Sequence, residues 1–353
     1  MPDAAAMARA ARSSVRVLGA ALSALALLAI VRAARRRARY RDLAGKVAIV
    51  TGGSRGLGLL IAEELGRRGA RVVICGRDQA ALEEAERRLT EQGIEVLARR
   101  ADLGERGQAE IFVERAALEW DRLDIVINNA GVIHVEPAES VSVDSLVEAL
   151  RSTFWSAAFT TLAALPHLRE RAPDARVVNI VSLGGRLAFP HMLGYSAAKF
   201  ALAGLSEGLS AELDRSGIRV TTVIPGLMRT GSFYNAEFAG DAPAELAWFR
   251  ALSSLPVISI DARRAARRVV RALVDGETVV HLGLAAALGA RLHGLAPSLV
   301  VRAMRLVSRL LPGAPAVPSP SRRGRDIPSS TRLRGLDARG ERAARAHNEL
   351  PSA

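Results

Sequence analysis

The sequence predicts an α/β protein with a doubly wound parallel sheet in three layers, an N-terminal hydrophobic helix and a C-terminal helical extension. Three observations predict this fold. After residue 45, short runs rich in β-branched residues alternate with helical stretches, as in a parallel sheet covered on both faces. A glycine-rich turn joins the first run to the first helical stretch. No internal repeat appears at the periods of solenoid proteins.

The alternation predicts seven strands with return helices between them. Strands are expected at residues 46–50, 71–75, 94–98, 124–128, 176–182, 218–224 and 278–282. Helices are expected to about residue 68, at 80–92, to about residue 120, near 143–168 and near 193–215. These elements form one domain, residues 43–284, in which ligands are expected at the carboxyl ends of the strands.

The formal net charge of +13 is concentrated at the two ends of the chain. Residues 1–41 carry nine arginines against Asp3, and residues 317–353 carry eight arginines against four acidic residues, so the stretch between is nearly neutral. Basic tails of this kind meet anionic lipid headgroups or stay solvated. With aromatics at 4% and no stacking motif, no nucleic-acid partner is expected. Cys75 is the only cysteine, which excludes an intrachain disulfide and favours a reducing compartment.

Residues 1–42 are interpreted as a hydrophobic anchor followed by a basic linker. Residues 17–31 carry no charge, which is short for a membrane span of roughly 20 residues, but flanking arginines extend the usable length. Six arginines follow the run and three precede it, so the positive-inside rule places the catalytic domain in the cytoplasm. A helix lying on the membrane surface and an Arg-rich transit peptide remain as alternatives.

The glycine-rich turn is expected to bind phosphate. Its glycines let the backbone approach a pyrophosphate closely, and the helix N-terminus behind it offers free N–H groups and a favourable dipole. Its position between the first strand and the first helix makes the signal strong, whereas such a turn alone would be weak. The expected cofactor contacts in this turn are Thr51, Gly52, Ser54, Arg55, Gly56, Leu57 and Gly58.

The end of the second strand indicates which dinucleotide binds. An NAD site has an acidic residue there, which accepts a hydrogen bond from the ribose 2′-hydroxyl. This chain has Gly76 and Arg77 at that place, and Arg55 in the glycine-rich turn. Two guanidinium groups suit a 2′-phosphate because they bind it through charge-assisted hydrogen bonds. We therefore predict NADP(H); the alternative is that both arginines are ordinary surface residues.

A YxxxK pattern supplies the candidate catalytic residues. Tyr195 and Lys199 are four residues apart on a predicted helix, so their side chains share a face. A cation close to a phenol favours the phenolate and lowers the pKa of the tyrosine. Tyr195 is thus suited to be the general acid in carbonyl reduction, or the base in alcohol oxidation. Ser182 lies at the end of the fifth strand, where its hydroxyl is expected to hydrogen-bond the reacting oxygen.

Together with Asn-Asn-Ala-Gly at residues 128–131 and Pro225-Gly226 after the sixth strand, these motifs resemble those of the short-chain dehydrogenase/reductase family over about residues 44–284. The resemblance implies a seven-stranded parallel (Rossmann) sheet. It implies that Tyr195 protonates the substrate oxygen, that Lys199 binds the nicotinamide ribose and lowers the tyrosine pKa, and that Ser182 orients the carbonyl. It further implies cofactor contacts from Asp102, Leu103, Asn129, Ala130, Gly131, Pro225, Gly226 and Thr230, while Asn128 steadies the sheet.

One position departs from the family pattern. Where the family usually has an asparagine that holds a water behind the lysine, this chain has Thr153. A shift of one residue does not restore the match, since no asparagine occurs between Asn129 and Asn179. The proton relay is therefore either rebuilt through water or weakened.

Aromatic residues gather in residues 231–256, where the family has its mobile substrate lid. They are Phe233, Tyr234, Phe238, Trp248 and Phe249. They predict an apolar pocket wall, although packing of the lid itself would give the same pattern. His134, Glu136 and His191 flank the predicted cleft without metal-ligand spacing, so no metal is expected, and His191 is the one placed to touch substrate.

Residues 285–312 are expected to form an amphipathic, basic extension that Pro297 splits into two helices. Such helices can lie in a membrane interface, dock on the catalytic domain or pair with a second subunit. Residues 313–353, rich in Pro, Ser and Arg, are predicted to be a disordered basic tail.

The sequence therefore predicts a membrane-associated NADP(H)-dependent oxidoreductase whose catalytic domain faces the cytoplasm. It is expected to reduce a carbonyl, or to oxidise the matching secondary alcohol, on an apolar, lipid-like substrate, and to be a homo-oligomer. The alternative from another class is a non-catalytic NADP(H)-binding sensor or scaffold at the membrane that lost its relay with Thr153.

Overall fold

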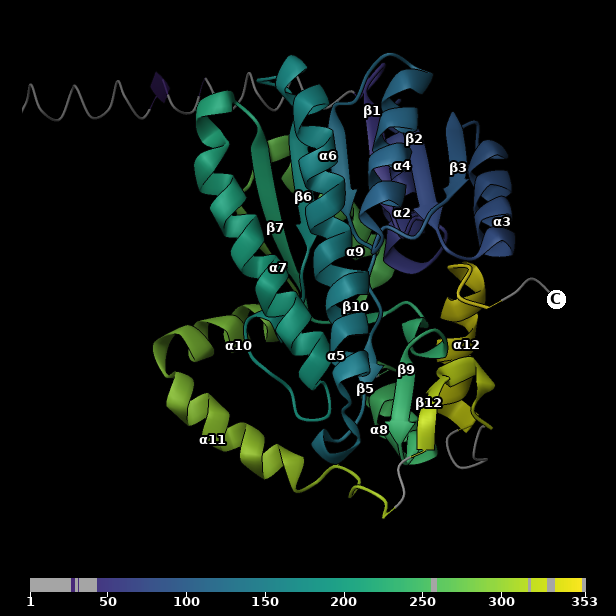
Figure 1. Ribbon diagram of the computed structural model, residues 1–353, viewed down its shortest axis with the longest axis vertical. Coiled ribbons are helices and arrows are strands. Elements are labelled where there is room, and N and C mark those ends of the chain that lie inside the picture. Colours follow the sequence, from purple (N-terminus) through teal and green to yellow (C-terminus); the bar gives the residue numbers. More distant parts are fainter. Residues whose placement is uncertain are drawn as a thin grey trace, which may run out of the picture. The chain divides into compact units, whose positions relative to one another are not determined.

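Seven strands form the central sheet in the order β11-β7-β6-β4-β1-β2-β3, and every neighbouring pair is parallel (Figure 1). The strands are β1 (Val47–Thr51), β2 (Arg71–Gly76), β3 (Val96–Arg100), β4 (Ile125–Asn128), β6 (Arg176–Ile180), β7 (Arg219–Pro225) and β11 (Val279–Leu282). All seven predicted strands are confirmed. The strand order reverses between β1 and β4, and a reversal of this kind opens a ligand crevice at the carboxyl ends of the strands.

This computed structural model describes residues 27, 28, 31, 43–254, 259–316, 319–328 and 334–350. The chain divides into two units, Met1–Asp42 and Leu43–Ala353, and the sheet belongs to the second. The predicted anchor at residues 17–31 lies almost wholly outside the described residues. Among the described residues, no helix is both long enough and apolar enough to cross a membrane.

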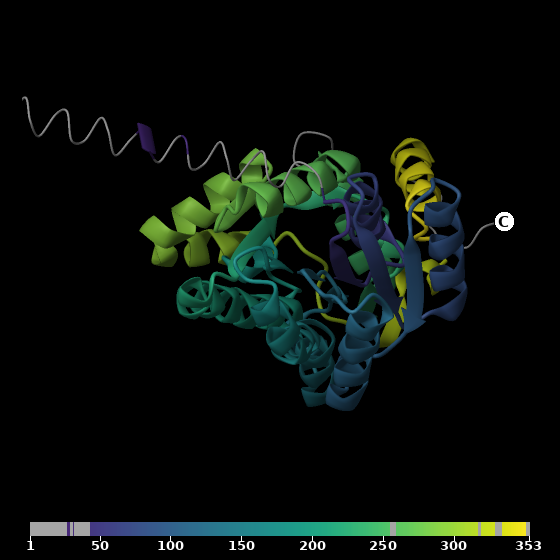
Figure 2. The ribbon, with the colours of Figure 1, turned by 90° about the horizontal axis from the view of Figure 1, so that it is seen from above.

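Helices cover both faces of the sheet (Figure 2). On one face α2 packs against α9, and on the other α4, α6 and α7 form a layer. The helices are α2 (Gly56–Gly66), α3 (Gln79–Thr90), α4 (Arg106–Glu119), α5 (Val143–Leu150), α6 (Ser156–Glu170), α7 (Leu193–Glu212) and α9 (Ala262–Asp275). Side-chain caps fix the starts of several helices; for example, Asp78 accepts from the N–H of Ala81 in α3 and Asp261 accepts from that of Arg264 in α9.

The long helix predicted near residues 143–168 is interrupted. A π-helical turn, Arg151–Trp155, separates α5 from α6. Single π turns inside α-helices are frequent at functional sites because they redirect a side chain. One of the residues in this turn is Thr153, whose side chain is fully buried.

A row of buried polar side chains crosses the middle of the sheet. Asn128 Nδ2 donates to Thr161 Oγ1 (2.7 Å) and to Asn179 Oδ1 (2.8 Å). Asn179 Nδ2 donates to Ser206 Oγ (2.9 Å), which shares a hydrogen bond of 2.7 Å with Thr222. The row joins β4, β6 and β7 to α6 and α7, so it fixes the helix that carries the YxxxK residues to the strands beneath it.

A second, three-stranded sheet lies beside the carboxyl ends of the main sheet. It has the order β12-β9-β5, formed by β5 (His134–Val135), β9 (Glu237–Gly240) and β12 (Ser319–Arg323). Helix α12 (Arg334–Ala346) follows β12. The disorder predicted for residues 313–353 is therefore wrong for these elements. The basic segment orders because β12 adds to the edge of β9 and because Ile327 and Ala344 are buried.

The substrate-lid region contains a helix, and the C-terminal extension is helical. The lid holds α8 (Ala242–Ser254), with β8 (Leu227–Arg229) before the lid in the chain and β10 (Ser259–Asp261) after it. The extension consists of α10 (Leu284–Leu295) and α11 (Pro297–Ser308), so the predicted split at Pro297 is confirmed. Large apolar side chains on both helices are exposed, including Leu284, Leu288, Leu292, Leu295, Leu299, Leu306 and Leu310.

Candidate active site

One cavity of about 530 Å³ lies at the carboxyl ends of the strands. Its walls bring together residues predicted from separate motifs: the glycine-rich turn, the ends of β2, β3 and β4, the YxxxK helix and the segment after β7. Thr51 and Gly58 are the two predicted residues that do not line it. Both support the turn from behind, since Thr51 Oγ1 accepts from the backbone N–H groups of Asn129 and Ala130 at 2.9 Å.

The glycine-rich turn is closed so tightly that its glycines are required. Gly52 and Gly56 have positive φ angles of 61° and 58°. A side chain on Gly58 would collide with the carbonyl oxygen of Gly52 and with Asn129. Asn129 Nδ2 also donates to the carbonyls of Thr51 and Gly52, both at 3.1 Å. This cradle of backbone at the N-terminus of α2 fits a dinucleotide pyrophosphate.

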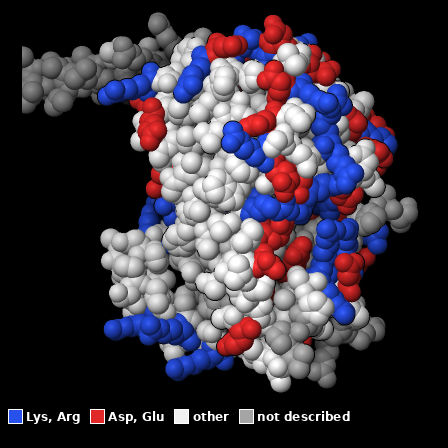
Figure 3. Space-filling view, in the orientation of Figure 1, with Lys and Arg blue, Asp and Glu red and all other residues white. Residues whose placement is uncertain are grey.

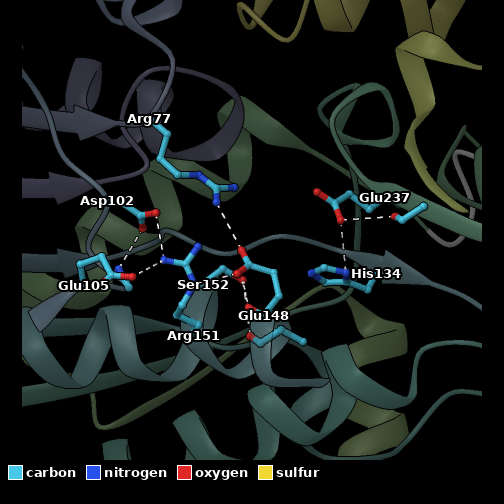
Figure 4. Close-up of polar contacts among 11 residues, drawn as sticks. Arg77, Asp102, Glu105, His134, Glu148, Arg151, Ser152 and Glu237 are labelled. Carbon is cyan, nitrogen blue, oxygen red and sulfur yellow. Dashed lines mark hydrogen bonds and ion pairs between the residues drawn. The ribbon is translucent and has the colours of Figure 1, made fainter. Parts of the chain in front are cut away.

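An ion-pair network joins the two sides of the adenine end of the cavity (Figure 4). Arg77 Nη1 lies 3.3 Å from Glu148 Oε1, and Arg151 Nε lies 2.7 Å from Glu148 Oε2. Arg151 Nη1 also pairs with Asp102 (3.0 Å) and Glu105 (3.1 Å). Arg77 and Asp102 were predicted from the sequence, whereas Glu148 and Arg151 were missed, because nothing in a helix sequence indicates which distant strand end it faces.

The catalytic candidates converge in the middle of the cavity. Tyr195 hydrogen-bonds Ser182, and Lys199 Nζ lies 5.8 Å from the centre of the Tyr195 ring. Lys199 is buried, and its Nζ donates to the carbonyl of Ile180 at 2.8 Å. The Ser182 hydroxyl accepts from the N–H of Gly184 at 3.0 Å, which holds it at the end of β6. The predicted triad of phenol, ammonium and serine is therefore assembled on one side of the cleft.

The expected lowering of the tyrosine pKa is not found. Burial raises the pKa of the Tyr195 phenol, and the hydrogen bond with Ser182 offsets only part of that rise. Burial also lowers the pKa of Lys199 to about 7, so part of its positive charge is lost at neutral pH. The prediction failed because it considered the neighbouring cation and not the desolvation of both groups.

Thr153 lies behind Lys199, as its place in the family pattern implies. A Cβ built on Gly131 would be 3.1 Å from Thr153 Oγ1 and 3.6 Å from Lys199 Nζ, so the three groups meet at one point. Among the described residues, no group hydrogen-bonds the buried Thr153 hydroxyl. A buried hydroxyl without a protein partner is a typical position for a bound water.

The far end of the cavity is apolar. Trp248, Phe249 and Leu252 from α8 line it, together with Met304 and Val307 from α11. Phe233 and Phe238 pack with Val135 and Ile327 in a small core that also includes Phe249, so the lid aromatics form both the pocket wall and the packing behind it. The two alternatives that the sequence left for these aromatic residues, a pocket wall and packing of the lid itself, are therefore both partly correct.

The polar residues flanking the cleft have structural partners. His191 Nδ1 lies 2.8 Å from Glu245 Oε1, and Trp248 Nε1 donates to Glu245 Oε2 at 2.6 Å, which ties the catalytic loop to the lid helix. His191 does not line the cavity, although its neighbours Pro190 and Met192 do. Among the described residues, no group of three His, Cys, Asp or Glu side chains has the geometry of a metal site.

Sequence reasoning missed the C-terminal segment in this site. His347, Asn348 and Glu349 are buried beside the glycine-rich turn, and Glu349 lines the cavity. A polar tripeptide at the end of a basic helix carries no motif that would have indicated this position.

Comparisons with known proteins agree with this geometry. The model of the short chain dehydrogenase family matches residues 46–237. An 11-beta-hydroxysteroid dehydrogenase A of Sesamum indicum is 32% identical over 246 residues, 68% of each chain. A short-chain dehydrogenase structure from Streptomyces avermitilis matches 75% of this chain and 97% of its own, with 31% identity and a TM-score of 0.64. A Burkholderia phymatum structure in complex with NAD is similar in fold, with a TM-score of 0.66 and 23% identity over 73% of this chain and 96% of its own. The chain is a member of the short-chain dehydrogenase/reductase family, which makes it an oxidoreductase that uses a nicotinamide dinucleotide.

Proposed function

We propose that this oxidoreductase is NADP(H)-dependent and interconverts a carbonyl and a secondary alcohol on an apolar, lipid-like substrate. The observation that carries the proposal is the cavity itself. At one end two arginines flank the glycine-rich turn, in the middle Tyr195, Ser182 and Lys199 converge, and at the other end the wall is apolar.

The bound nicotinamide would supply or accept the hydride. Ser182 holds the substrate oxygen by a hydrogen bond, and the Tyr195 hydroxyl gives that oxygen a proton in the reductive direction. Because burial raises the pKa of Tyr195, the phenol remains protonated through neutral pH and is ready to act as the acid. Lys199 lies where it would bind the ribose hydroxyls. The apolar wall excludes water from the reacting carbon.

The preference for NADP(H) is supported by charge at the adenine end. Arg55 and Arg77 both line the cavity. The Arg77 guanidinium has one long contact of 3.3 Å with Glu148 and is 43% exposed, so a 2′-phosphate has access to it. At the end of β2, where an acidic residue would favour NAD, the chain has Gly76.

The apolar substrate and the membrane association are supported by α10 and α11. Met304 and Val307 of α11 line the cavity, whereas Leu299 and Leu306 of the same helix are 66% and 60% exposed. One helix thus links the substrate end of the cavity to an exposed apolar surface. Arginines on α10 and α11 suit anionic headgroups. We further propose that the catalytic domain faces the cytoplasm, as the arginines around residues 17–31 indicate.

A homo-oligomer is supported by the face over α5, α6 and α7. Figure 3 shows charged side chains gathered over β2, β3, α3 and α4, and few over α6 and α7. Val147, Trp155 and Leu162 are about half exposed on this face, at 54%, 45% and 57%. An uncharged face with exposed apolar side chains is typical of a subunit interface.

The activity is tested by NADPH oxidation with a series of ketones of rising chain length. We expect turnover to favour the lipophilic members, and Tyr195→Phe to lower kcat by about 100-fold or more while NADPH affinity is kept. Equal rates in the variant and the native protein would exclude the mechanism. NADPH binding without turnover of any ketone would instead favour the sensor or scaffold alternative.

The cofactor preference is tested by Arg77→Ala. We expect the ratio of NADPH to NADH affinity to fall about tenfold or more, since a charged hydrogen bond to the 2′-phosphate is lost. Arg99→Ala is the matched control, because Arg99 lies on neighbouring β3, pairs with Glu119 and does not line the cavity. An unchanged ratio in the Arg77 variant would contradict the assignment.

A further inference from the structure

The C-terminal segment binds the same backbone groups that a pyrophosphate needs. The N–H of Gly56, at the start of α2, donates to the carbonyl of His347 at 2.8 Å. The carboxylate of Glu349 lies so close to Gly56 that a side chain on that glycine would collide with it. A carbonyl oxygen and a carboxyl oxygen therefore lie at the N-terminus of α2, the place where a phosphate would bind.

The segment is held there by specific hydrogen bonds. Asn348 Nδ2 donates to the carbonyl of Ser54 (2.8 Å), in the turn, and to that of Ala81 (2.9 Å), in α3. Asn235 Nδ2 donates to the Glu349 carbonyl (2.8 Å) and to its Oε2 (2.7 Å). Asn235 Oδ1 in turn accepts from Arg55 Nη1 at 2.5 Å. Arg55, the residue expected at a 2′-phosphate, is thereby drawn into the same network.

The backbone of the segment turns into the cavity rather than away from it. Asn348 has a positive φ of 59°, a conformation that often ends a helix, and it is the second residue after α12. Ala344 of α12 packs on Gly231, next to Thr230, whose carbonyl lies 3.3 Å from His347 Nδ1. Residues 347–349 thus lie between the glycine-rich turn and the segment after β7.

We propose that residues 347–350 compete with the dinucleotide for its site in the same chain. These residues have to leave the glycine-rich turn before the cofactor phosphates can accept a hydrogen bond from the Gly56 N–H. The inference rests on the proposed dinucleotide site and adds regulation to it. The Glu349 side chain is buried against Gly56 and fills the space that a cofactor phosphate needs at the turn, so the segment and the cofactor exclude one another.

The first test uses the full chain without any substitution. Hydrogen exchange at residues 340–350 is measured with and without saturating NADPH, with α9 as an internal reference. We expect exchange at the amides of His347 and Glu349, which now donate to Ala343 and Ala344, to become at least tenfold faster when NADPH is bound. Slower exchange would mean that the segment closes over the cofactor, and this would overturn the proposal, as would no change.

The second test measures the dissociation constant of NADPH by fluorescence. We expect Asn348→Ala, which loses two hydrogen bonds that hold the segment, to bind NADPH about tenfold more tightly. Glu341→Ala is the matched control, since Glu341 lies on α12 and pairs only with Arg345 among the described residues. Equal affinity in all three proteins overturns the competitor and leaves the dinucleotide site intact. Failure of every form to bind NADPH or NADH would instead remove the proposed function and the inference with it.

Discussion

At the scale of single residues, Thr153 is where this chain differs most from its family in the catalytic region. Its hydroxyl is fully buried, meets Gly131 and Lys199, and has no hydrogen-bond partner among the described groups. A threonine side chain is shorter than that of asparagine, but in this π-helical turn its hydroxyl still lies beside Gly131, as the Lys199 ammonium does. The geometry supports a water held between Thr153 and Lys199 rather than a lost relay.

Thr153→Val tests this role because valine keeps the shape and removes the hydroxyl. We expect kcat to fall about tenfold with little change in NADPH affinity, since proton transfer slows and binding does not. The melting temperature should change little, because the Thr153 hydroxyl has no protein partner among the described residues. An unchanged kcat would show that Thr153 takes no part in proton transfer.

The raised pKa of Tyr195 predicts the pH profile. The phenol stays protonated well above neutral pH, so Tyr195 itself should impose no pH dependence on kcat/KM for reduction through neutrality. For alcohol oxidation, kcat/KM should rise with pH toward the ordinary tyrosine pKa of about 10 and beyond. The Ser182 hydrogen bond lowers this pKa, so Ser182→Ala should move the oxidation limb to higher pH. A limb that moves to lower pH would contradict the assignment.

At the scale of elements, the buried polar row links the strands to the helix that presents Tyr195. Asn179 stands in its middle, accepting from Asn128 and donating to Ser206. Asn179→Ala removes both contacts and leaves the Asn128 amide short of a partner in a dry interior. We expect a loss of about 2 kcal/mol in the free energy of unfolding, measured by chemical denaturation. The double variant with Asn128→Ala should lose less than the sum of the two single losses, because the residues are coupled. Strict additivity would argue against a continuous row.

The elements predicted from sequence are those whose signals are local. The strands were found because runs such as Val72, Val73 and Ile74 are buried on both faces and need no alternation. The π turn at Thr153 was missed because a one-residue insertion in a helical ladder leaves no mark on periodicity. The strand β12 was missed because its order comes from pairing with β9, more than 75 residues away, and not from apolar content.

The candidate site also contains residues that local motifs predict and residues that only the folded structure reveals. Nearly all of the site residues that the motifs predicted line the cavity, since each glycine or YxxxK residue belongs to a short pattern. The partners that control those residues came only with the structure. Glu148 and Arg151 face Arg77 and Asp102 across the cavity, and Glu349 reaches Gly56 from the end of the chain. Long-range contacts between polar side chains follow from the packed fold, which single-sequence patterns do not encode.

At the scale of the whole molecule, residues 347–350, late in the second unit, contact the glycine-rich turn near its beginning. Glu349 makes that contact sensitive to pH. Burial raises the pKa of Glu349 to about 7, although Arg55 and the Asn235 hydrogen bond both lower it. The docked segment therefore favours the protonated carboxyl. The stabilisation of the docked segment by the protonated carboxyl is present in full below the ordinary glutamate pKa of about 4.3. It is lost progressively as the pH rises through about 7. Of the neighbouring titratable groups, His347 has a pKa that burial lowers, which favours its neutral form.

Docking of residues 347–350 should accordingly weaken between pH 5.5 and pH 8, and the full chain should bind NADPH on the order of tenfold more tightly at the higher pH. The 2′-phosphate of the cofactor also titrates near pH 6, so the comparison needs a protein in which Glu349 cannot ionise. Glu349→Gln keeps the size of the side chain and its contact with Asn235. In this variant, NADPH binding should retain only the pH dependence that comes from the cofactor phosphate. The measurement is the NADPH dissociation constant of both proteins across this range. Curves that run parallel would show that Glu349 does not couple docking to pH, whereas a steeper curve for the native chain gives the coupling directly.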